Sequence, residues 1–279
     1  MANIISGKEL AQNIKEDVKV EVTHLLAEGI KPRLAIVQVG DNPASNSYVK
    51  GKLKDCNEVG IDATLVKMDA DVTQSELELT VSSLVLDNSI HGILVQLPLP
   101  SHINEERILE FIPSDKDVDG FSADNMGRLW SSRDAFIPCT PAGCLYMLKS
   151  VETNLSGKQA VIIGRSNIVG KPMAALLLQE NMTVTICHSK TKNLKEICKT
   201  ADVLVVAIGK TKFINEEYIK PGAIVIDIGI NRDADGKLCG DVDFASAAQV
   251  ASAITPVPGG VGLMTRAMLL KNVIKSAKR

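Results

Sequence analysis

Hydrophobic and polar positions follow two patterns along the chain, and these patterns predict helices separated by short buried strands. In the first 27 residues apolar side chains recur every three or four positions, which is typical of an amphipathic helix, and Ser6 can cap its start. The next apolar run, RLAIVQVG at 33–40, is short and ends in Gly-Asp-Asn-Pro. This ending is typical of a buried strand followed by a turn.

The alternation continues as two series of elements. The first series is predicted to contain helices at about 43–59 and 73–86 and strands at 61–68 and 91–97. A long irregular stretch at 98–141, with one short helical piece, is followed by a helix at about 141–151. The second series is predicted to contain strands at 159–164, 183–187, 202–209 and 223–229 and helices at about 170–180, 193–200 and 215–219. Strands that alternate with helices form parallel sheets, so the fold class is α/β.

The length of 279 residues suits two domains, each with its own core. We expect an N-terminal α/β domain with a parallel sheet at 1–145 and a Rossmann-like domain at 146–261. An amphipathic helix at 262–279 is expected to pack back on the first domain.

The stretch AVIIGRSNIVGKPM at 160–173 predicts a phosphate-binding turn. Its strand delivers Gly164 to the carboxyl edge of a parallel sheet, where ligands of doubly wound folds bind. Gly170 and Pro172 open the next helix, whose free amides and dipole suit an anion. Five residues separate the two glycines, so the turn departs from the usual G-x-G-x-x-G fingerprint.

The next strand predicts which dinucleotide binds this turn. It ends in CHSK at 187–190, without the acidic residue that usually bonds the ribose of NAD. Ser189, Lys190 and Arg165 instead offer donors and positive charge, which a 2′-phosphate requires. We therefore expect NADP, although Arg165 and Lys190 could also be solvated surface charges.

A second group of polar residues falls in the first series of elements. Tyr48 and Lys52 are four apart on a predicted helix and so project from one face. A lysine held against apolar surroundings can lose its charge and act as a general acid or base. Gln96 ends a strand, and Asp117 and Asp119 flank a tight turn in KDVDGF. The alternatives are a solvated lysine face, a satisfied edge glutamine, and aspartates that only cap backbone amides.

Eight motifs in order, spanning nearly the whole chain, resemble those of the bifunctional methylenetetrahydrofolate dehydrogenase/methenyltetrahydrofolate cyclohydrolase family. The motifs are N-P-A-S-x-x-Y-V-x-x-K, V-Q-L-P-L-P, K-D-V-D-G-F, P-C-T-P, G-R-S-x-I-V-G-x-P, C-H-S-K-T, P-G-A-x-V-I-D-x-G-I-N and T-P-V-P-G-G-V-G. The resemblance implies NADP-dependent oxidation of methylenetetrahydrofolate and hydrolysis of the product to formyltetrahydrofolate, in one-carbon folate metabolism. It also implies a homodimer whose active site lies in a cleft between a folate-binding catalytic domain and the NADP domain.

The resemblance also implies a role for each matching residue. Lys52 would be the catalytic lysine, Tyr48 would line the folate site, Gln96 would assist Lys52, and Asp119 would hold the pterin ring. The cofactor would be held by Gly164, Arg165, Ser166, Ser189 and Ile230. The substrate side of the cleft would be lined by Pro258, Gly259 and Gly260.

One position departs from the family pattern, and two other functions compete with the family assignment. Leu263 stands where the family has proline, so we expect the first turn of the last helix to form but to be less rigid. A shikimate dehydrogenase would also place a small substrate domain before a Rossmann domain. A folate- or nucleotide-binding protein without catalysis is the other alternative.

Composition and charge exclude several partners. Lys and Arg number 31 against 33 Asp and Glu, a formal charge of −2, so no basic excess predicts binding to nucleic acid or an anionic membrane. No run approaches the ~20 apolar residues of a membrane span, and the N-terminus does not resemble a secretory signal. The six cysteines form no C-x-x-C pair, so we expect neither disulfides nor a metal site. A cytoplasmic protein is expected.

Overall fold

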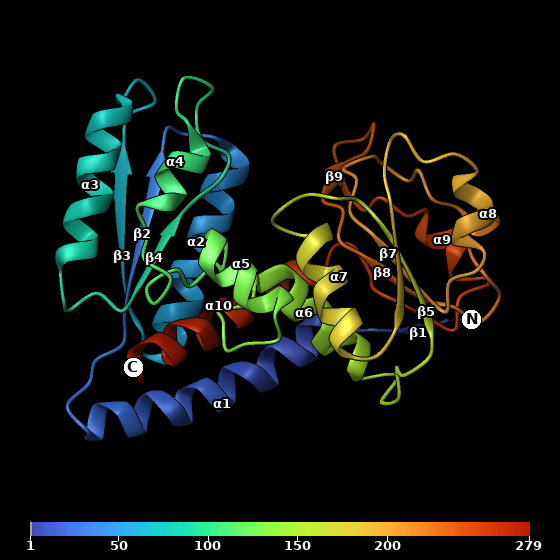
Figure 1. Cartoon of the computed structure of the whole chain (residues 1–279), viewed down its shortest axis with the longest axis horizontal. Coiled ribbons are helices and arrows are strands. Elements are labelled where there is room, and N and C mark those ends of the chain that lie inside the picture. Colours follow the sequence, from blue (N-terminus) through green and yellow to red (C-terminus); the bar gives the residue numbers. More distant parts are fainter. Residues whose placement is uncertain (1) are drawn as a thin grey trace. The chain divides into compact units, whose positions relative to one another are not determined.

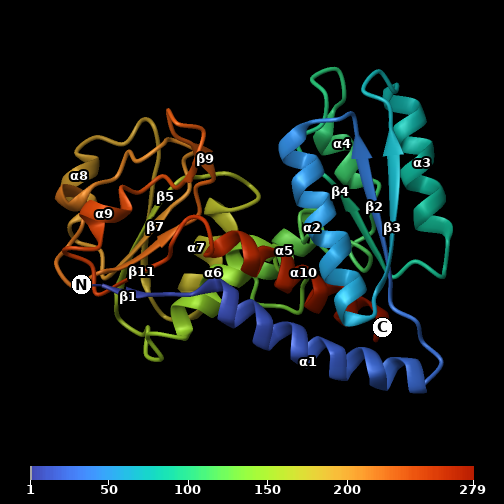
Figure 2. The same cartoon turned by 180° about the vertical axis from the view of Figure 1, so that it is seen from behind.

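The computed structural model describes residues 2–279 and divides the chain into two compact units (Figures 1 and 2). Unit 1 comprises the residues up to Ala11 together with Thr140–Thr265, and unit 2 comprises Gln12–Cys139 together with Arg266–Arg279. Each unit contains a parallel sheet with helices, which confirms the predicted α/β class.

Unit 1 is built on a six-stranded sheet in which every strand is parallel to its neighbours. The strands, in the order in which they lie across the sheet, are β1 (Asn3–Ile4), β11 (Ala253–Ile254), β8 (Ile224–Asp227), β7 (Val203–Val206), β5 (Gln159–Ile163) and β6 (Thr183–Cys187). Figure 2 shows β1 beside β11, far from it in sequence. All four residues of both β7 and β8 are buried, as expected of parallel strands covered on both faces.

The remaining elements of unit 1 are short. They are α6 (Cys139–Lys149), α7 (Gly170–Gln179), α8 (Leu194–Cys198), the 3₁₀ helix η1 (Glu216–Tyr218), the antiparallel pair β9 (Asn231–Arg232) and β10 (Leu238–Cys239), and α9 (Phe244–Ala247). One core cluster joins alternate residues of β5, β7 and β8, among them Val161, Leu204 and Val225. This alternation follows from the period of two in a strand.

Unit 2 is built on a three-stranded parallel sheet in the order β3 (Asp62–Met68), β2 (Arg33–Val39) and β4 (Gly92–Val95). Its helices are α2 (Pro43–Val59), α3 (Gln74–Leu86), α4 (Glu105–Glu110) and α5 (Ala123–Trp130), while α1 (Gly7–Ala27) and α10 (Val261–Ala277) contribute residues to both units. Alternate residues of β2 and β4 pack against α3 and α4 on one face of the sheet (Figure 1).

The start of α2 follows the rules for a helix N-terminus. The Asn42 side chain accepts hydrogen bonds from the amides of Ala44 and Ser45, and Pro43 occupies the first turn, where its missing donor is not needed. Gly60 ends the helix with φ of 88°, a left-handed conformation that glycine adopts at little cost. The bounds of α2 agree with the predicted helix.

Strand order reverses at one strand in each sheet, and the point of reversal indicates where each candidate site lies. In unit 2 the chain goes from β2 to β3 on one side and then to β4 on the other. In unit 1 it goes from β5 to β6 and then to β7. At such a point the two connections diverge, which leaves an open crevice at the carboxyl ends of the strands. The crevices therefore lie beside Gly40 and Gln96 in unit 2 and beside Gly164 in unit 1.

Several predicted elements differ from those in the structure. The stretch at 98–141 contains two helices, α4 and α5, because the side chains of Asn104 and Ser122 cap both starts. The strand predicted at 202–209 ends at Val206, because the amides of Ile208 and Gly209 donate to the Asp241 carboxylate instead of a neighbouring strand. The two-residue strands β1 and β11 were not predicted, since a run this short has no readable period.

Leu263 lies in the first turn of α10, and that turn is formed as expected. Its amide donates a hydrogen bond to the carbonyl of Gly260 at 3.2 Å. Proline has no amide hydrogen and would not make this bond.

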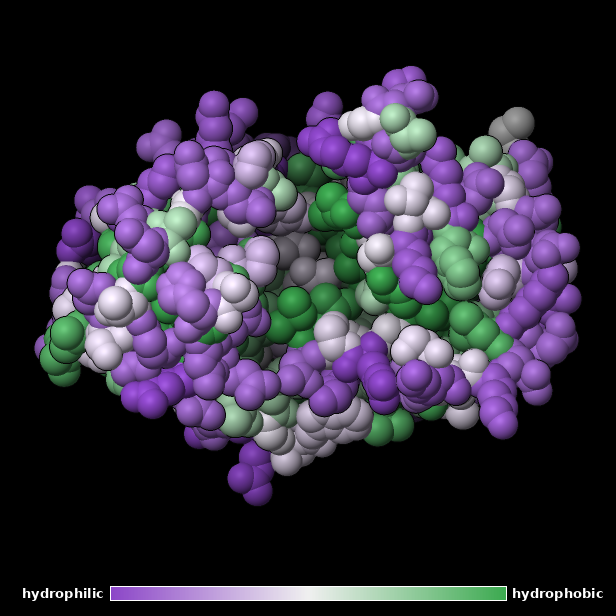
Figure 3. Space-filling model, turned by 90° about the horizontal axis from the view of Figure 1, so that it is seen from above, coloured by the Kyte–Doolittle hydropathy of each residue, from purple (hydrophilic) through white to green (hydrophobic). Residues whose placement is uncertain are grey.

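Within residues 2–279, no helix is both long enough and apolar enough to cross a membrane. Hydrophilic residues cover much of the surface of both units on the face shown in Figure 3.

Gly164 and Gly170 bring three elements of unit 1 into close contact. Gly164 has φ of 133°, and a Cβ at this position would overlap the carbonyl oxygen of Ala207, just after β7. A Cβ at Gly170 would overlap the carbonyl oxygen of Gly164. The five-residue spacing of these glycines therefore lets the start of α7 pack directly on the end of β5.

We expect Gly164→Ala to lower the free energy of unfolding by about 2–3 kcal/mol, because a positive φ and an overlap with backbone act together. Gly127→Ala is the control: Gly127 lies within α5, and a Cβ added there would have no neighbouring atom within 4 Å, so alanine should stabilise by up to about 1 kcal/mol. Urea unfolding of both variants measures the difference. Equal effects at the two positions would contradict the close packing at Gly164.

Candidate functional site

Lys52 forms the centre of the candidate site in unit 2. It lies in the middle of α2, only 6% exposed, and its Nζ donates a hydrogen bond to Oε1 of Gln96 at 3.0 Å. The Gln96 Nε2 donates to the carbonyl of Leu97 at 2.7 Å, so the amide is held with its oxygen toward Lys52. Because Gln96 directly follows β4, this pair lies at the carboxyl edge of the unit 2 sheet.

Tyr48 lies one turn before Lys52 on α2, so the two side chains share a face. Tyr48 is half-buried. Burial raises the pKa of the Tyr48 phenol, while the positive charge of Arg266 lowers it. The phenol is therefore a neutral donor and acceptor at physiological pH, beside an aromatic ring that can contact a flat ligand.

The two aspartates of KDVDGF have different surroundings. The Asp117 carboxylate accepts hydrogen bonds from the amides of Gly120, Phe121 and Ser122, at 3.0, 3.2 and 2.8 Å, and from Nδ2 of Asn125 at 3.0 Å. The alternative of a backbone-capping aspartate therefore describes Asp117. Asp119, by contrast, does not cap the backbone amides of this turn.

The Asp119 carboxyl lies close to Lys52 and to the thiol of Cys139. Burial raises the pKa of Asp119, and the charge of Lys52 together with a hydrogen bond from Cys139 acts in the opposite direction. Burial and the neighbouring Asp119 raise the pKa of the Cys139 thiol well above its usual value. Cys139 therefore stays protonated and can donate. Sequence reasoning missed Cys139 as a neighbour of the site, although it lies in the P-C-T-P motif.

Asn272 of α10 holds the backbone on both sides of this group. Its Nδ2 donates to the carbonyl of Val118 at 2.8 Å and to that of Ile137 at 3.0 Å, and lies 3.6 Å from Sγ of Cys139. Sequence reasoning missed Asn272 because these contacts span more than 130 positions. Its only sequence signal is an asparagine in the predicted last helix.

The structure places the predicted cofactor residues of unit 1 around the turn after β5. The Ser166 hydroxyl accepts hydrogen bonds from the amides of Val169 and Gly170, at 3.1 and 3.3 Å. Arg165 is exposed, as is Ser189 in the turn after the neighbouring strand β6. The Gly164 amide donates to the carbonyl of Cys187 at 2.9 Å, which ties the two turns together.

The loop after β8 is held by two buried aspartates that sequence reasoning missed. Asp241 accepts hydrogen bonds from the amides of Ile208, Gly209 and Lys210. Asp227, at the end of β8, accepts from the amides of Gly229, Asp241 and Val242, and burial raises its pKa to about 7. In the sequence, the signal for Asp227 was that an acidic residue ends the apolar run AIVID. The network fixes the carboxyl edge of unit 1.

Ile230 and the Pro258–Gly260 loop also lie at this edge. Ile230 follows β8 and is 50% exposed. The loop follows β11 and leads directly into α10. A Cβ on Gly260 would overlap the carbonyl oxygen of Pro256, so the loop needs glycine there. An exposed apolar side chain at the same sheet edge as a phosphate-type turn fits a dinucleotide, which carries both charged and flat apolar parts.

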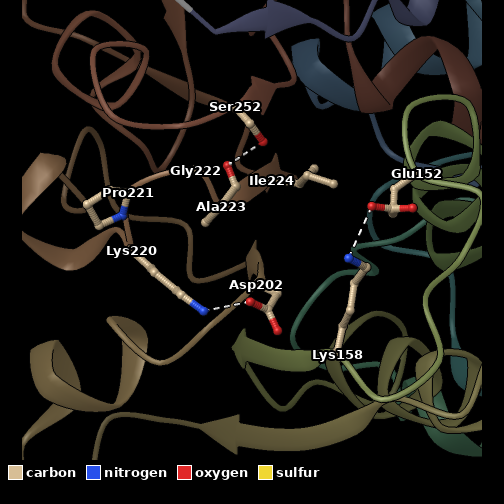
Figure 4. Close-up of a pocket in the computed structure, with 9 residues that line it drawn as sticks. All are labelled: Glu152, Lys158, Asp202, Lys220, Pro221, Gly222, Ala223, Ile224 and Ser252. Carbon is tan, nitrogen blue, oxygen red and sulfur yellow. Dashed lines mark hydrogen bonds and ion pairs between the residues drawn. The ribbon is translucent and has the colours of Figure 1, made fainter.

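A pocket at the opposite edge of unit 1 lies near the first residues of β5, β7 and β8 (Figure 4). Its two lysines are paired: Lys220 with Asp202 at 2.7 Å and Lys158 with Glu152 at 3.1 Å. Ligands of open parallel sheets bind at the carboxyl edge instead. The charges of this pocket hold loops together and supply no free cation for a cofactor.

Within residues 2–279 no three His, Cys, Asp or Glu side chains gather in a way that could hold a metal ion. Every cysteine described is a buried free thiol. The chemistry available at the two carboxyl edges is that of a lysine, a carboxyl, a phenol and an amide in unit 2, and of an arginine, hydroxyls and backbone groups in unit 1.

Comparison with known proteins agrees with this arrangement. The family model described as "Tetrahydrofolate dehydrogenase/cyclohydrolase, catalytic domain" matches residues 5–119, and the corresponding "NAD(P)-binding domain" model matches residues 138–279. A curated relative from Listeria innocua, "Bifunctional protein FolD", is 56% identical over 100% of this chain and 98% of its own length.

Solved structures give the same result. A bifunctional FolD methylenetetrahydrofolate dehydrogenase/cyclohydrolase from Campylobacter jejuni is 49% identical, with a TM-score of 0.97 over 100% of this chain and 99% of its own. The Trypanosoma brucei enzyme, complexed with NADP cofactor and inhibitor, is 37% identical, with a TM-score of 0.95 over 100% and 98% of the two chains. A shikimate dehydrogenase at 14% identity and a TM-score of 0.50 shares the fold alone. The chain therefore belongs to the tetrahydrofolate dehydrogenase/cyclohydrolase family, as its motifs predicted.

Proposed function

We propose that Lys52, held by Gln96, transfers the protons in the second of the two reactions that this chain catalyses. The chain oxidises methylenetetrahydrofolate to methenyltetrahydrofolate with NADP and hydrolyses the product to formyltetrahydrofolate, in one-carbon folate metabolism. The observation that carries the proposal is the buried Lys52 amine, whose one hydrogen bond among the described side chains goes to a neutral amide at the crevice.

In the hydrolysis a water oxygen forms a bond to the methenyl carbon. The Lys52 amine accepts the first proton of this water, which leaves a neutral hydroxyl adduct. That proton then passes to a ring nitrogen as the bond from this nitrogen to the carbon breaks and the imidazoline ring opens. The remaining hydroxyl proton is released as the formyl C=O forms, so the cation and water give formyltetrahydrofolate and one proton. Gln96 keeps the Lys52 nitrogen aimed at the reacting carbon, and Tyr48 contacts the flat part of the folate.

Asp119 is proposed to hold the pterin ring. Asp117 takes over the capping of the turn, so the Asp119 carboxylate is left to accept two donors from the amino-substituted ring. Charge-assisted bonds of this kind are about twice as strong as neutral ones. Lys52 favours the ionised form of Asp119 and thereby opposes the effect of burial on its pKa.

For the oxidation, unit 1 is proposed to bind NADP at the turn after β5. Gly164 and Gly170 let the backbone approach a phosphate closely. The free helix amides expected here are not available, because the amides of Gly170 and Lys171 donate to Ser166 and Pro172 has none. Arg165, Ser166 and Ser189 supply donors for the 2′-phosphate and pyrophosphate, and Ile230 and Pro258–Gly260 line the rest of the site. NADP supplies the hydride acceptor, and the protein holds the methylene carbon in reach of it.

The domain assignment and the assembly are part of the same proposal. Unit 2 binds folate and unit 1 binds NADP. The expected folate domain, 1–145 with 262–279, therefore gives up its first residues to the expected NADP domain, 146–261, because β1 lies in the unit 1 sheet. The chain acts as a homodimer in the cytoplasm. The formal charge of −2 supports small-molecule partners and gives no basis for nucleic acid or membrane binding.

Lys52→Met should lower the rate of methenyltetrahydrofolate hydrolysis at least about 100-fold, because the general base is lost, while folate still binds. Loss of methenyl absorbance measures the rate, and quenching of the single tryptophan or equilibrium dialysis measures binding. Lys54→Met, an exposed lysine of the same helix, is the matched control and should hydrolyse normally. Near wild-type hydrolysis by Lys52→Met would assign the proton transfer to another group.

Arg165→Ala should raise the KM for NADP at least about tenfold and the KM for NAD less than about twofold, because only NADP carries the phosphate that a charge-assisted bond would recognise. Initial rates with each dinucleotide give both constants. Arg232→Ala removes one exposed positive charge elsewhere in unit 1 and should change neither. Equal increases for the two cofactors in Arg165→Ala would remove the 2′-phosphate assignment.

A further inference from the structure

Three charged residues from three helices are in contact near Tyr48 and Lys52: Lys15 of α1, Asp55 of α2 and Arg266 of α10. Asp55 is 2% exposed, and its carboxylate pairs with Nζ of Lys15 at 2.6 Å and with Nε of Arg266 at 2.9 Å. Lys15 also pairs with Glu58 at 2.9 Å. The two cations and two anions of this cluster balance in charge, and Arg266 shares its one carboxylate, Asp55, with Lys15.

The guanidinium of Arg266 has donors to spare. Its buried Nε lies 2.9 Å from Oδ2 of Asp55 without forming a hydrogen bond, and the hydrogen bonds of residues 2–279 include none from its two Nη groups. The Arg266 side chain is 23% exposed, so its outer edge is open to a ligand. An arginine fork with free, partly desolvated donors suits a carboxylate, which can accept two parallel bonds.

Gly51 determines where the Nη edge of the Arg266 guanidinium lies. A Cβ at Gly51 would overlap Nη1 of Arg266, so the guanidinium occupies the space that a side chain would fill. Tyr48, Gly51 and Asp55 follow one another at three- and four-residue spacing and share a face of α2 with Lys52. Arg266 therefore lies between Asp55 and Tyr48, and its charge reaches the Tyr48 phenol, where it opposes the effect of burial on the pKa.

We propose that the Nη edge of Arg266 binds a carboxylate of the glutamate portion of the folate substrate. This inference rests on the proposed function. The pterin end of the substrate is taken by Asp119 and Lys52, and its p-aminobenzoyl ring lies against Tyr48. The group that follows this ring is glutamate, which bears two carboxylates. Arg266 is thus a specificity residue, which distinguishes folates with a glutamate from the same pterin without one.

The experiment compares KM for 5,10-methylenetetrahydropteroate, which has no glutamate, with KM for the monoglutamate and triglutamate forms of methylenetetrahydrofolate. In the wild type the pteroate form should have a KM at least about tenfold higher than the monoglutamate form. Arg266→Gln should bring that ratio close to one, and Arg266→Lys should leave part of it. Gly51→Ala should also lower the ratio, because it displaces the guanidinium without removing it.

Arg128→Gln is the matched control. Arg128 is an exposed arginine of unit 2 paired with an aspartate, Asp124, as Arg266 is with Asp55, and its loss should leave the ratio unchanged. Thermal unfolding of each variant checks the fold, since Asp55 keeps Lys15 as a partner when Arg266 is replaced.

Two results would overturn the proposal: a wild-type ratio near one, and an unchanged ratio in Arg266→Gln. An unchanged ratio with both KM values raised equally would mean that Arg266 contacts the aromatic ring instead. Absence of any turnover of the three substrates by the wild type would be distinguishable from these, because it would overturn the proposed function as well.

Discussion

The hydrogen bond from Lys52 to Gln96 is the interaction on which the proposed chemistry depends. A lysine amine within a helix–sheet interface must have a polar partner, because an unpaired buried amine is strongly unfavourable. Here the partner is a neutral amide oxygen, held in place by the bond from its own Nε2 to the next carbonyl. The Gln96 oxygen carries no formal charge, so this hydrogen bond forms no ion pair with the amine. A carboxylate in the same place would hold the proton on Lys52 and prevent it from acting as a base.

The strand order explains why this pair can meet. Lys52 comes from the helix after β2 and Gln96 from the end of β4, the two strands between which the order of the unit 2 sheet reverses. Unit 1 repeats this arrangement at β5 and β7, with Gly164 in the equivalent position. In both units the divergence of the two connections opens the carboxyl edge. At this edge unit 2 carries a reactive side chain, whereas unit 1 carries a backbone turn that contains glycine.

Much of the fold, and the family, could be predicted from the sequence. Apolar periodicity predicted α2 over its full length, and the motifs identified the family. Residues that act through distant contacts could not be predicted, because no local pattern records them. Asn272 joins two loops from the last helix, and Asp227 and Asp241 fix backbone amides of segments up to 33 positions away. Arg266 is similar: its importance depends on the missing side chain of Gly51, far away in sequence. The roles of Tyr48, Asp119, Arg165 and Ser189 remain proposals.

The pH dependence of methenyltetrahydrofolate hydrolysis in Gln96→Glu tests the central claim most directly. This change keeps the size of the side chain and replaces the neutral oxygen facing Lys52 with a charged one. If Lys52 is the base, the carboxylate will hold its proton, and the rising limb of the rate profile will move to higher pH by at least about one unit. A rising limb at the same pH as in the wild type would contradict the assignment of Lys52 as the proton-transfer group.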